Sequence, residues 1–286
     1  MNIFITGNKG LIGSALEKRL IKEGHKIVGS IDHRSGSDLS WLKNLEIDTS
    51  IDLFIHAAAH VKINKMVADP KIANLNNAQG TFYALDFCRK HKIPKFVFFS
   101  SSRILSPEKN SYTASKIYGE ELCKGFYNSY GIEYIIIRPS TVYGPFWDLS
   151  KRLVHLHILA ALRGEELKIF GNPLTKTLDF TYIDDFIEGT MLTINSNEWN
   201  KEYNISGKEE YNVYDEAKYI LELTGSKSQI NSYSAEIAQP QKVSLDCSEI
   251  KKLGYMPKTP LEEGLRKTIE WYKEYIQKNP VVLEED

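Results

Sequence analysis

The sequence predicts an α/β fold, in which a doubly wound parallel sheet of the Rossmann type is joined to a smaller C-terminal α/β substrate domain. The first observation is a short apolar run at residues 2–6 that leads into a glycine-rich turn and a helical pattern. The second is an alternation of strand-like and helix-like segments, which continues for about 140 residues. Such alternation is typical of a parallel sheet covered by helices on both faces.

The first elements are a strand, a turn, a helix and a second strand. Residues 2–6 form the expected strand, and glycines occupy positions 7, 10 and 13. A helical pattern then runs to about residue 23, because Leu11, Leu16 and Leu20 recur on one side, and Gly24 ends it. Residues 25–31 form the expected second strand, which Asp32 closes.

The later elements follow from the same periodicities. We expect strands at 52–57, 95–100, 133–139, 168–170 and 201–205, and helices at 70–91, 111–130, 151–163, 184–195, 213–223 and 261–276. The regular alternation weakens after Gly144-Pro145, which we take as a domain boundary. Residues 1–146 are the expected dinucleotide-binding domain, 147–286 the smaller substrate-binding domain, and 184–206 are expected to return to the first domain.

The composition is that of a globular protein with a substantial core. The chain has 286 residues, 42% hydrophobic and 26% charged, and its formal net charge is −1. This balance favours neither a nucleic-acid-binding surface nor a disordered chain. No apolar run approaches the ~18 residues of a membrane span, and no signal peptide precedes the first strand, so we expect a cytoplasmic protein without a membrane partner.

Residue types that bind metals or form disulfides do not cluster in the sequence. The cysteines at 88, 123 and 247 are far apart and form no C-x-x-C pair, which predicts reduced, buried thiols in a reducing compartment. His155 and His157 stand two residues apart on an expected helix, where they do not share a face. We therefore predict no metal site.

The glycine turn predicts a dinucleotide site. Glycines let the backbone approach a pyrophosphate at the helix N-terminus, and Asp32 can bind the adenosine ribose diol. Taken alone, the spacing G-x-x-G-x-x-G could form only a tight turn, but here the strand, the helix and the acid accompany it. Asp32 favours NAD because a carboxylate repels a 2′-phosphate, whereas Lys9 and Arg34 could accept one, so NADP stays possible.

Tyr112 and Lys116 are the most informative pair. They stand four residues apart on an expected helix and so share a face. A free tyrosine ionises near pH ~10, and a nearby cation lowers that pKa. We therefore expect Tyr112 to exchange a proton with a substrate hydroxyl. The spacing alone is also common on solvated helix faces. The other motifs of the chain must therefore show whether this pair is catalytic.

Short motifs occur in a fixed order along almost the whole chain, at residues 6–13, 56–59, 77–81, 99–102, 112–116, 138–145, 170–171, 179–185, 203–205 and 253–257. Together they resemble the extended short-chain dehydrogenase/reductases that act on nucleotide sugars, the NAD-dependent epimerase/dehydratase group. The UDP-glucose 4-epimerase-like enzymes are the most similar branch.

The resemblance assigns roles to individual residues. It implies that Ser102, Tyr112 and Lys116 are catalytic: Ser102 bonds the substrate oxygen, Tyr112 is the acid/base, and Lys116 holds the nicotinamide ribose and lowers the Tyr112 pKa. The implied cofactor-binding residues are Gly7, Gly10, Leu11, Ile12, Gly13, Asp32, Arg34, Asp38, Leu39, Ala57, Ala58, Ala59, Ser100, Tyr112, Lys116, Pro139 and Val142. The implied substrate-binding residues are Ser102, Arg103, Thr141, Lys176 and Lys242.

The implied reaction is epimerisation of a nucleotide sugar through a transient keto-sugar, with hydride passing to and from bound NAD. An NADP-dependent keto-sugar reductase is the alternative, because the span from Asp32 to Asp52 is as short as in such reductases. A catalytically idle dinucleotide-binding scaffold is a remote alternative. Elimination is disfavoured, because Arg103 follows Ser102 where dehydratases and decarboxylases carry an acid.

Four departures from the family pattern concern the substrate. Only nine residues separate Ser102 from Tyr112. Leu178 stands where an arginine usually grips the diphosphate, with Lys176 nearby. The later Arg-Pro position reads Gln239-Pro240, with Lys242 close by, and Thr141 replaces the usual asparagine. Lysine does not reproduce a bidentate arginine.

The resemblance also implies a homodimer. Residues 80–88 and 112–127 correspond to helices that pair across a two-fold axis in this family. Phe82, Leu85 and Phe126 are the apolar residues that we expect on the outer faces of these helices.

Overall fold

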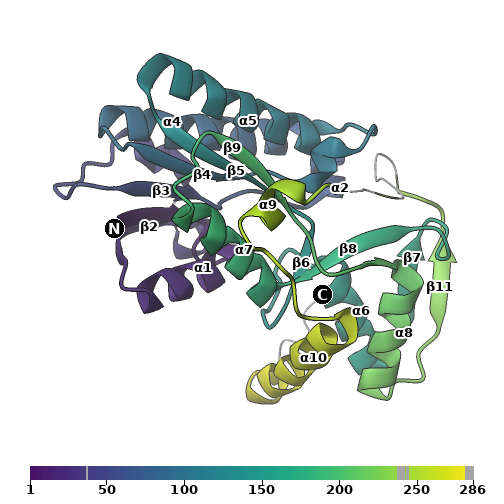
Figure 1. The fold of residues 1–286 in the computed structure, drawn as a ribbon. Helices are drawn as coiled ribbons and strands as arrows, with labels where there is room; N and C mark the ends of the chain where they lie inside the picture. Colours follow the sequence, from purple (N-terminus) through teal and green to yellow (C-terminus); the bar gives the residue numbers. More distant parts are fainter. Residues whose placement is uncertain (37, 237–241, 243–244, 281–286) are drawn as a thin grey trace.

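The computed structural model describes residues 1–36, 38–236, 242 and 245–280, and Figure 1 shows their arrangement. A six-stranded sheet lies at its centre, in the order β2-β1-β3-β4-β5-β9, and every neighbouring pair is parallel. Its strands are β1 (Asn2–Thr6), β2 (Lys26–Ile31), β3 (Leu53–His56), β4 (Lys95–Phe99), β5 (Glu133–Pro139) and β9 (Lys201–Ile205).

Helices cover both faces of this sheet, as the sequence predicted. Figure 1 shows α4 (Gln79–Lys90) and α5 (Ser111–Tyr130) together over one face, and α1 (Leu11–Lys22) with α7 (Ile183–Asn195) on the other. The doubly wound fold is therefore confirmed. The strand order reverses at β1, with β2 on one side and β3 on the other. Such a reversal opens a crevice at the carboxyl ends of the strands.

Alternation along the strands builds a separate core under each helical layer, because successive side chains of a strand point to opposite faces. Phe4, Phe54 and Phe96 pack toward α4 and α5, with neighbouring ring centroids 5.1 and 5.5 Å apart. Leu85 and Phe126, which the sequence placed on the outer surface, also lie in this core at 0% and 8% exposure. That expectation was wrong, because the helix faces that bear them turn toward the sheet.

The core on the other face continues into the C-terminal part of the chain. Ile5 and Val97 share it with Phe186 of α7 and with residues as distant as Tyr272. That part contains a three-stranded sheet of order β10-β8-β6 and the two-stranded β11-β7 pair. Its elements are β6 (Thr141–Tyr143), α6 (Leu153–Arg163), β7 (Leu167–Phe170), β8 (Thr177–Tyr182), β10 (Glu210–Asn212), α8 (Val213–Thr224), β11 (Ile230–Tyr233), α9 (Ser248–Lys252) and α10 (Leu261–Lys278).

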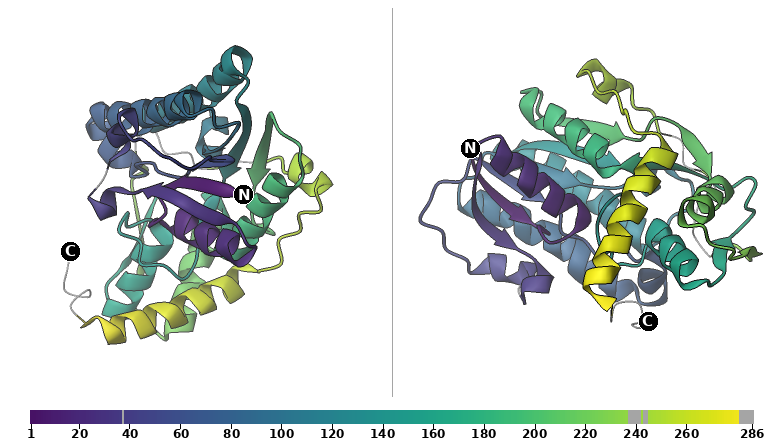
Figure 2. Two further views of the ribbon diagram at one scale, coloured as in Figure 1. Left: turned by 90° about the vertical axis from the view of Figure 1, so that its left-hand side faces the viewer. Right: turned by 90° about the horizontal axis from the view of Figure 1, so that it is seen from below.

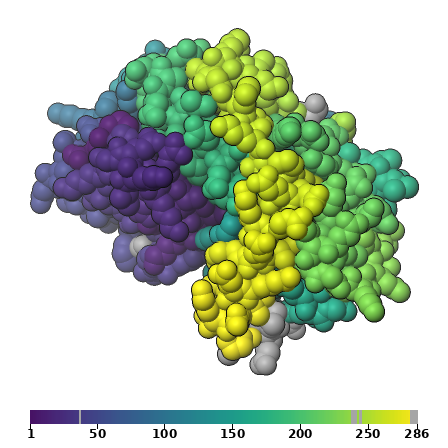
Figure 3. All heavy atoms as spheres, turned by 60° about the horizontal axis from the view of Figure 1, so that its bottom comes forward, coloured from purple at the N-terminus to yellow at the C-terminus, as the bar shows by residue number. Residues whose placement is uncertain are grey.

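The last long helix connects the two parts of the molecule. Figure 2 and Figure 3 show α10, in yellow, lying along the boundary between the N-terminal elements and the green C-terminal ones. Its Tyr272 hydroxyl donates to the Phe146 carbonyl (2.9 Å) and bonds His155 Nδ1 (2.7 Å). The two parts are thus packed together as one body.

The sequence missed several short elements. It did not predict α2 (Ile63–Ala68), α9, β6, β8, β10 or β11. All of these span only three to six residues, too few for a clear periodic pattern. The expected helix at 70–91 is divided into α3 (Pro70–Ile72), the π-helix η3 (Ala73–Ala78) and α4. π-helical segments are frequent at functional sites.

The expectation about the cysteines can be compared directly with the structure. Cys88, Cys123 and Cys247 are free and buried, as predicted. Of the helices in the described part of the chain, none is long and apolar enough to cross a membrane.

Candidate active site

The turn after β1 requires glycine. Gly7 has a φ of +74°, and a Cβ there would lie 2.6 Å from the Ala58 nitrogen. A Cβ at Gly13 would lie 2.1 Å from the Gly7 carbonyl oxygen. Gly10 precedes α1, whose first turn has neither a capping side chain nor an acidic residue. The N-terminus of α1 is therefore suited to an anion such as a pyrophosphate.

A cavity of about 590 Å³ lies at the carboxyl ends of β1, β2 and β3. It brings together nine of the predicted cofactor-binding residues, Gly7, Gly10, Asp32, Arg34, Asp38, Leu39, Ala57, Ala58 and Ala59. The sequence did not indicate Gln79 and Tyr83, which also line it, or Lys43, whose ammonium lies 4.4 Å from the Tyr83 ring centre. The volume and the glycine cradle fit the adenosine half of a dinucleotide.

Asp32 supports the glycine turn from the end of β2. It is 4% exposed, and its two carboxylate oxygens accept hydrogen bonds from the backbone nitrogens of Lys9 and Arg34, both at 2.9 Å. The Arg34 guanidinium donates to the Lys9 carbonyl and lies 5.9 Å from the Phe146 ring centre. Arg34 is thus engaged in closing the turn, while the carboxylate of Asp32 lines the cavity.

Several predicted cofactor residues lie outside this cavity. Leu11 and Val142 are buried, Ile12 and Pro139 are half-buried, and Ser100 is buried with a hydroxyl that bonds no described residue. Leu11, Thr141 and Val142 instead line a smaller cavity beside Arg152.

The first turn of α5 is anchored by its cap. Asn110 accepts a hydrogen bond from the Thr113 nitrogen (3.0 Å), and Thr113 Oγ1 accepts one from the Asn110 nitrogen (2.8 Å). This capping box sets where the helix begins. Ser111 also donates to the Met66 carbonyl (2.6 Å), so α2 packs on the same turn. Tyr112 is thereby buried against Met66, at 7% exposure.

The pKa of Tyr112 differs from the expectation. Burial raises it, and a hydrogen bond with Ser101 and the charges of Arg103 and Arg152 lower it by less. The two arginines supply these lowering charges; the Lys116 ammonium donates to the Phe99 carbonyl (2.7 Å) and lies 5.0 Å from the Phe98 ring centre. The Tyr112 pKa is thus raised in this arrangement, whereas the sequence led us to expect a lowered value.

Lys116 itself is in a buried environment. It is 4% exposed, and burial lowers its pKa to about 8, against the opposing charge of Glu120. An ammonium with such a pKa is still largely protonated at neutral pH.

The serine that contacts Tyr112 is Ser101. Its hydroxyl shares a hydrogen bond with Tyr112 and accepts another from the Arg103 nitrogen (3.2 Å), capping η4 (Ser102–Leu105). Ser102 is 7% exposed at the start of the same turn. Sequence reasoning selected Ser102 and missed Ser101, because three consecutive serines carry no signal for which hydroxyl faces the helix.

Asn77 is a second residue that sequence reasoning did not assign. Its side chain accepts from the His60 nitrogen (2.8 Å) and donates to the His60 carbonyl (3.0 Å) and to Ser115 Oγ (3.3 Å). His60 lines the 590 Å³ cavity, and Ser115 precedes Lys116. Asn77 therefore links the cofactor crevice to α5. The only available signal was its place in the motif at 77–81.

His56 is a structural residue. It is buried, and its Nδ1 and Nε2 bond the hydroxyls of Thr6 (2.8 Å) and Thr81 (3.2 Å). Burial and the Lys116 charge lower its pKa to about 3, so it stays neutral.

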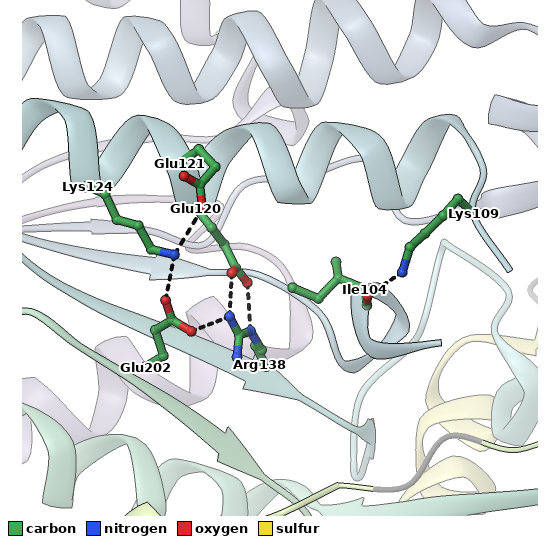
Figure 4. Close-up of polar contacts among 7 residues, drawn as sticks. All are labelled: Ile104, Lys109, Glu120, Glu121, Lys124, Arg138 and Glu202. Carbon is green, nitrogen blue, oxygen red and sulfur yellow. Dashed lines mark hydrogen bonds and ion pairs between the residues drawn. The ribbon is translucent and has the colours of Figure 1, made fainter. Parts of the chain in front are cut away.

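A network of ion pairs lies under α5 (Figure 4). Arg138 at the end of β5 donates two bonds to Glu120, at 2.8 and 2.5 Å, and one to Glu202 of β9. Lys124 pairs with Glu202 at 2.8 Å. The network holds α5 to the two strands beneath it.

The short connection between Ser102 and Tyr112 contains a hydrogen bond within itself. Lys109 donates to the Ile104 carbonyl at 2.6 Å, as Figure 4 also shows.

The predicted substrate residues divide into two groups. Arg103 interacts electrostatically with Tyr112 and Lys176, whereas Lys242 pairs with Glu210 at 2.9 Å. Leu178 is buried in the core at 7% exposure. Gln239 and Pro240 lie outside the described residues.

No group of three metal-binding side chains occurs among the residues that the structure describes. His155 bonds Tyr272, whereas His157 bonds Glu216 (2.7 Å) and the Lys168 carbonyl (3.1 Å).

Residues 3–206 match the model of the NAD dependent epimerase/dehydratase family. A putative UDP-glucose 4-epimerase of Methanocaldococcus jannaschii is 26% identical, with 95% of this chain and 98% of that protein covered. A trifunctional UDP-glucose 4,6-dehydratase/UDP-4-keto-6-deoxy-D-glucose 3,5-epimerase/UDP-4-keto-L-rhamnose-reductase of Arabidopsis thaliana is 29% identical over 96% of this chain. The chain spans about half the length of that plant protein, 47%.

Two solved structures are similar over nearly the whole chain. The UDP-glucose 4-epimerase of Thermotoga maritima with UDP-glucose has a TM-score of 0.88 at 25% identity, covering 96% of this chain and 100% of that one. The UDP-glucuronic acid 4-epimerase of Bacillus cereus, in complex with UDP-glucuronic acid and NAD, has a TM-score of 0.86 at 26% identity, with the same coverage. The chain therefore belongs to the NAD-dependent epimerase/dehydratase family.

Proposed function

We propose that this protein is an NAD-dependent nucleotide-sugar epimerase that acts through a transient keto-sugar. One observation carries the proposal: a crevice suited to a dinucleotide is linked through His60 and Asn77 to the helix that bears Tyr112 and Lys116. The family and the epimerases among its relatives support the reaction class.

Tyr112 is the proposed acid/base. As the phenolate, it takes the proton of a sugar hydroxyl while that carbon is oxidised, and as the phenol it returns the proton after the keto-sugar has rotated. Bound NAD would supply the hydride acceptor for the oxidation and the hydride donor for the reduction on the opposite face of the sugar. Ser101 hydrogen-bonds the Tyr112 hydroxyl, and Ser102 beside it is the proposed contact to the substrate oxygen.

Lys116 is proposed to contact the nicotinamide ribose, for which it must leave the Phe99 carbonyl or share its protons between the two. An ammonium has three N–H donors, so Lys116 can bond the Phe99 carbonyl and the ribose at the same time. The predicted cofactor residues around the 590 Å³ cavity would hold the adenosine half and the pyrophosphate. The proposed substrate contacts are Ser102, Arg103, Thr141, Lys176 and Lys242.

NAD is favoured over NADP. Asp32 presents a carboxylate to the cavity, and Arg34 donates to the Lys9 carbonyl instead of presenting a free cation. A keto-sugar reductase of the same family is the second candidate, supported by the short connection between β2 and β3 and by the reductase activity of the plant relative.

The test is to purify the protein and incubate it with UDP-glucose, UDP-galactose, UDP-glucuronic acid and the corresponding dTDP and GDP sugars. An epimerase should retain NAD through purification, form a second sugar by NMR and show no net absorbance change at 340 nm. Stoichiometric oxidation of NADPH with a keto-sugar would establish the reductase instead. If no sugar nucleotide is converted, the proposal fails.

We also propose a homodimer formed through the exposed face of α4 and α5. Phe82 and Tyr118 are 40% and 45% exposed there, and a groove of about 720 Å³ runs between them and Pro70. Leu85 and Phe126 take no part, because they belong to the core. Light scattering should give twice the monomer mass at micromolar concentration. Phe82→Glu should convert this to the monomer mass.

The division into a dinucleotide-binding part (1–146 with 184–206) and a smaller substrate-binding part (147–286) is proposed on the same basis. The pairing of β9 with β5 supports the return of 184–206 to the first part. We propose that the protein acts in the cytoplasm, where its three thiols would stay reduced.

A further inference from the structure

Arg103 has an unsatisfied donor beside the proposed reaction centre. It follows Ser102 in η4, and its backbone nitrogen donates to Ser101, the serine that contacts Tyr112. Nη1 of its guanidinium is buried and bonds no atom of the described residues. Nearly all buried polar groups in native proteins are hydrogen-bonded, so an orphaned arginine nitrogen calls for a partner. A guanidinium has donors only, so that partner must be an acceptor.

A second cation and a carboxylate lie near Arg103. Lys176, half-buried before β8, donates to the Phe170 carbonyl at 2.6 Å and is within electrostatic reach of Arg103. Glu236, which follows β11, interacts with both cations and hydrogen-bonds Asn64 of α2. Because Asn64 belongs to α2 and Glu236 to the segment after β11, this hydrogen bond joins two parts of the chain that are far apart in the sequence. Within this group of described residues, one carboxylate thus interacts with two cations.

The position of Arg103 and Lys176 indicates which part of the substrate would lie beside them. Arg103 acts on the charge of Tyr112, the proposed acid/base, and so belongs to the end of the site where the sugar reacts. The nucleotide base has no reason to carry an anion there. The ligand must therefore present its acceptor from the sugar ring, or from the diphosphate next to it.

We propose that Arg103 and Lys176 form a carboxylate subsite, and that the substrate is a nucleotide-linked uronic acid. This inference rests on the proposed function and names its substrate class. A guanidinium binds a carboxylate through two parallel hydrogen bonds, and Nη1 of Arg103 is available for one of them. Glu236 is the protein carboxylate that interacts electrostatically with the same two cations. On binding, the substrate carboxylate replaces Glu236 as their negatively charged partner.

The experiment measures binding and turnover separately. Calorimetry with UDP-glucuronic acid, UDP-glucose and UDP is carried out on the wild-type holoenzyme and on Arg103→Gln, Arg103→Lys, Lys176→Gln and Glu236→Gln. Arg266→Gln is the matched control, since Arg266 is exposed on α10 and pairs only with Glu262 among the described residues. Melting temperature and retained NAD show that each variant is folded.

The wild type should bind UDP-glucuronic acid at least ~10-fold more tightly than UDP-glucose, the effect of a charge-assisted contact. Arg103→Gln should remove this preference while UDP binding stays within about twofold. Arg103→Lys should retain only part of the preference for UDP-glucuronic acid over UDP-glucose, and Glu236→Gln should increase that preference. Equal affinity for the acidic and neutral sugars in the wild type overturns the inference.

A loss of UDP affinity in Arg103→Gln also overturns it, because the cations would then bind the diphosphate. Turnover tests the proposed function independently. Conversion of neutral sugars alone leaves the epimerase intact and rejects the uronic acid. A binding preference without conversion of any sugar supports the carboxylate subsite and rejects the epimerase.

Discussion

Glu120 and Arg138 form a two-bond ion pair beneath α5, at 2.8 and 2.5 Å, one helical turn beyond Lys116. Glu120 is 4% exposed, and its charge is the one that raises the Lys116 pKa against the effect of burial. Arg138 holds that carboxylate in place and is itself held by Glu202. The pair therefore connects the sheet to the protonation state of the lysine proposed to contact the cofactor.

We predict that Glu120→Gln shifts the alkaline limb of the pH–rate profile to lower pH. The Lys116 pKa, about 8 in the wild type, falls further when burial is no longer opposed by the Glu120 charge. The unfolding free energy should fall by about 1–3 kcal/mol, the cost of a charged hydrogen bond. The measurement is kcat against pH, with denaturant unfolding alongside.

Glu121→Gln is the matched control for this prediction. Glu121 is the next residue of α5, 67% exposed, and pairs only with Lys124 among the described residues. Its profile should be unchanged. An unchanged profile in Glu120→Gln as well would remove Glu120 from any role in tuning Lys116.

Tyr112→Phe should keep the fold and the bound cofactor but lower turnover at least ~100-fold, because a positioned acid/base is lost. The Phe ring can still fill the pocket against Met66. Tyr214→Phe, exposed on α8, is the control and should behave as the wild type. A near-normal rate in the Tyr112 variant would exclude the hydroxyl from the mechanism.

Ser101→Ala and Ser102→Ala should differ in their pH dependence. The hydrogen bond from Ser101 lowers the Tyr112 pKa, so its removal should raise that pKa and shift the limb that reports the phenolate to higher pH. Ser102→Ala should lower kcat/KM by about 10–100-fold without moving that limb, if Ser102 contacts only the substrate. Identical profiles in the two variants would contradict this division of roles.

His157 should make the stability depend on pH. Its two ring nitrogens face the Glu216 carboxylate and the Lys168 carbonyl, which both only accept, so the ring is held protonated. Burial lowers its pKa, but Glu216 and the carbonyl raise it more. The stabilisation is therefore complete below the unfolded pKa of ~6.5 and is lost as pH rises through the folded pKa.

Urea unfolding from about pH 6 to about pH 9 measures this contribution, which His157→Gln should abolish. His155 is the opposite case, since burial lowers its pKa to about 4. Its effect appears as a loss of stability when pH falls below ~6.5, because the unfolded chain then binds the extra proton. A wild type whose stability does not change between neutral and alkaline pH would refute the His157 prediction.

The sequence by itself determined the elements with strong local signals. The glycines before α1 and the short apolar runs of the main strands act within a few residues, so the main sheet, its helices and the Tyr112–Lys116 spacing follow from the pattern. Strands β6, β8, β10 and β11 were missed, because pairing with distant strands stabilises three to six residues that carry no clear period of their own.

Only the tertiary structure decided where individual side chains point. Ser101 and Ser102 are equivalent in sequence, and the turn of η4 brings Ser101 to Tyr112. Lys116 reaches the Phe99 carbonyl because that strand end lies beneath α5. Arg103 and Lys176 stand 73 positions apart in the sequence, and the fold brings their side chains within electrostatic reach of each other. Such contacts depend on long-range packing, which no local pattern encodes.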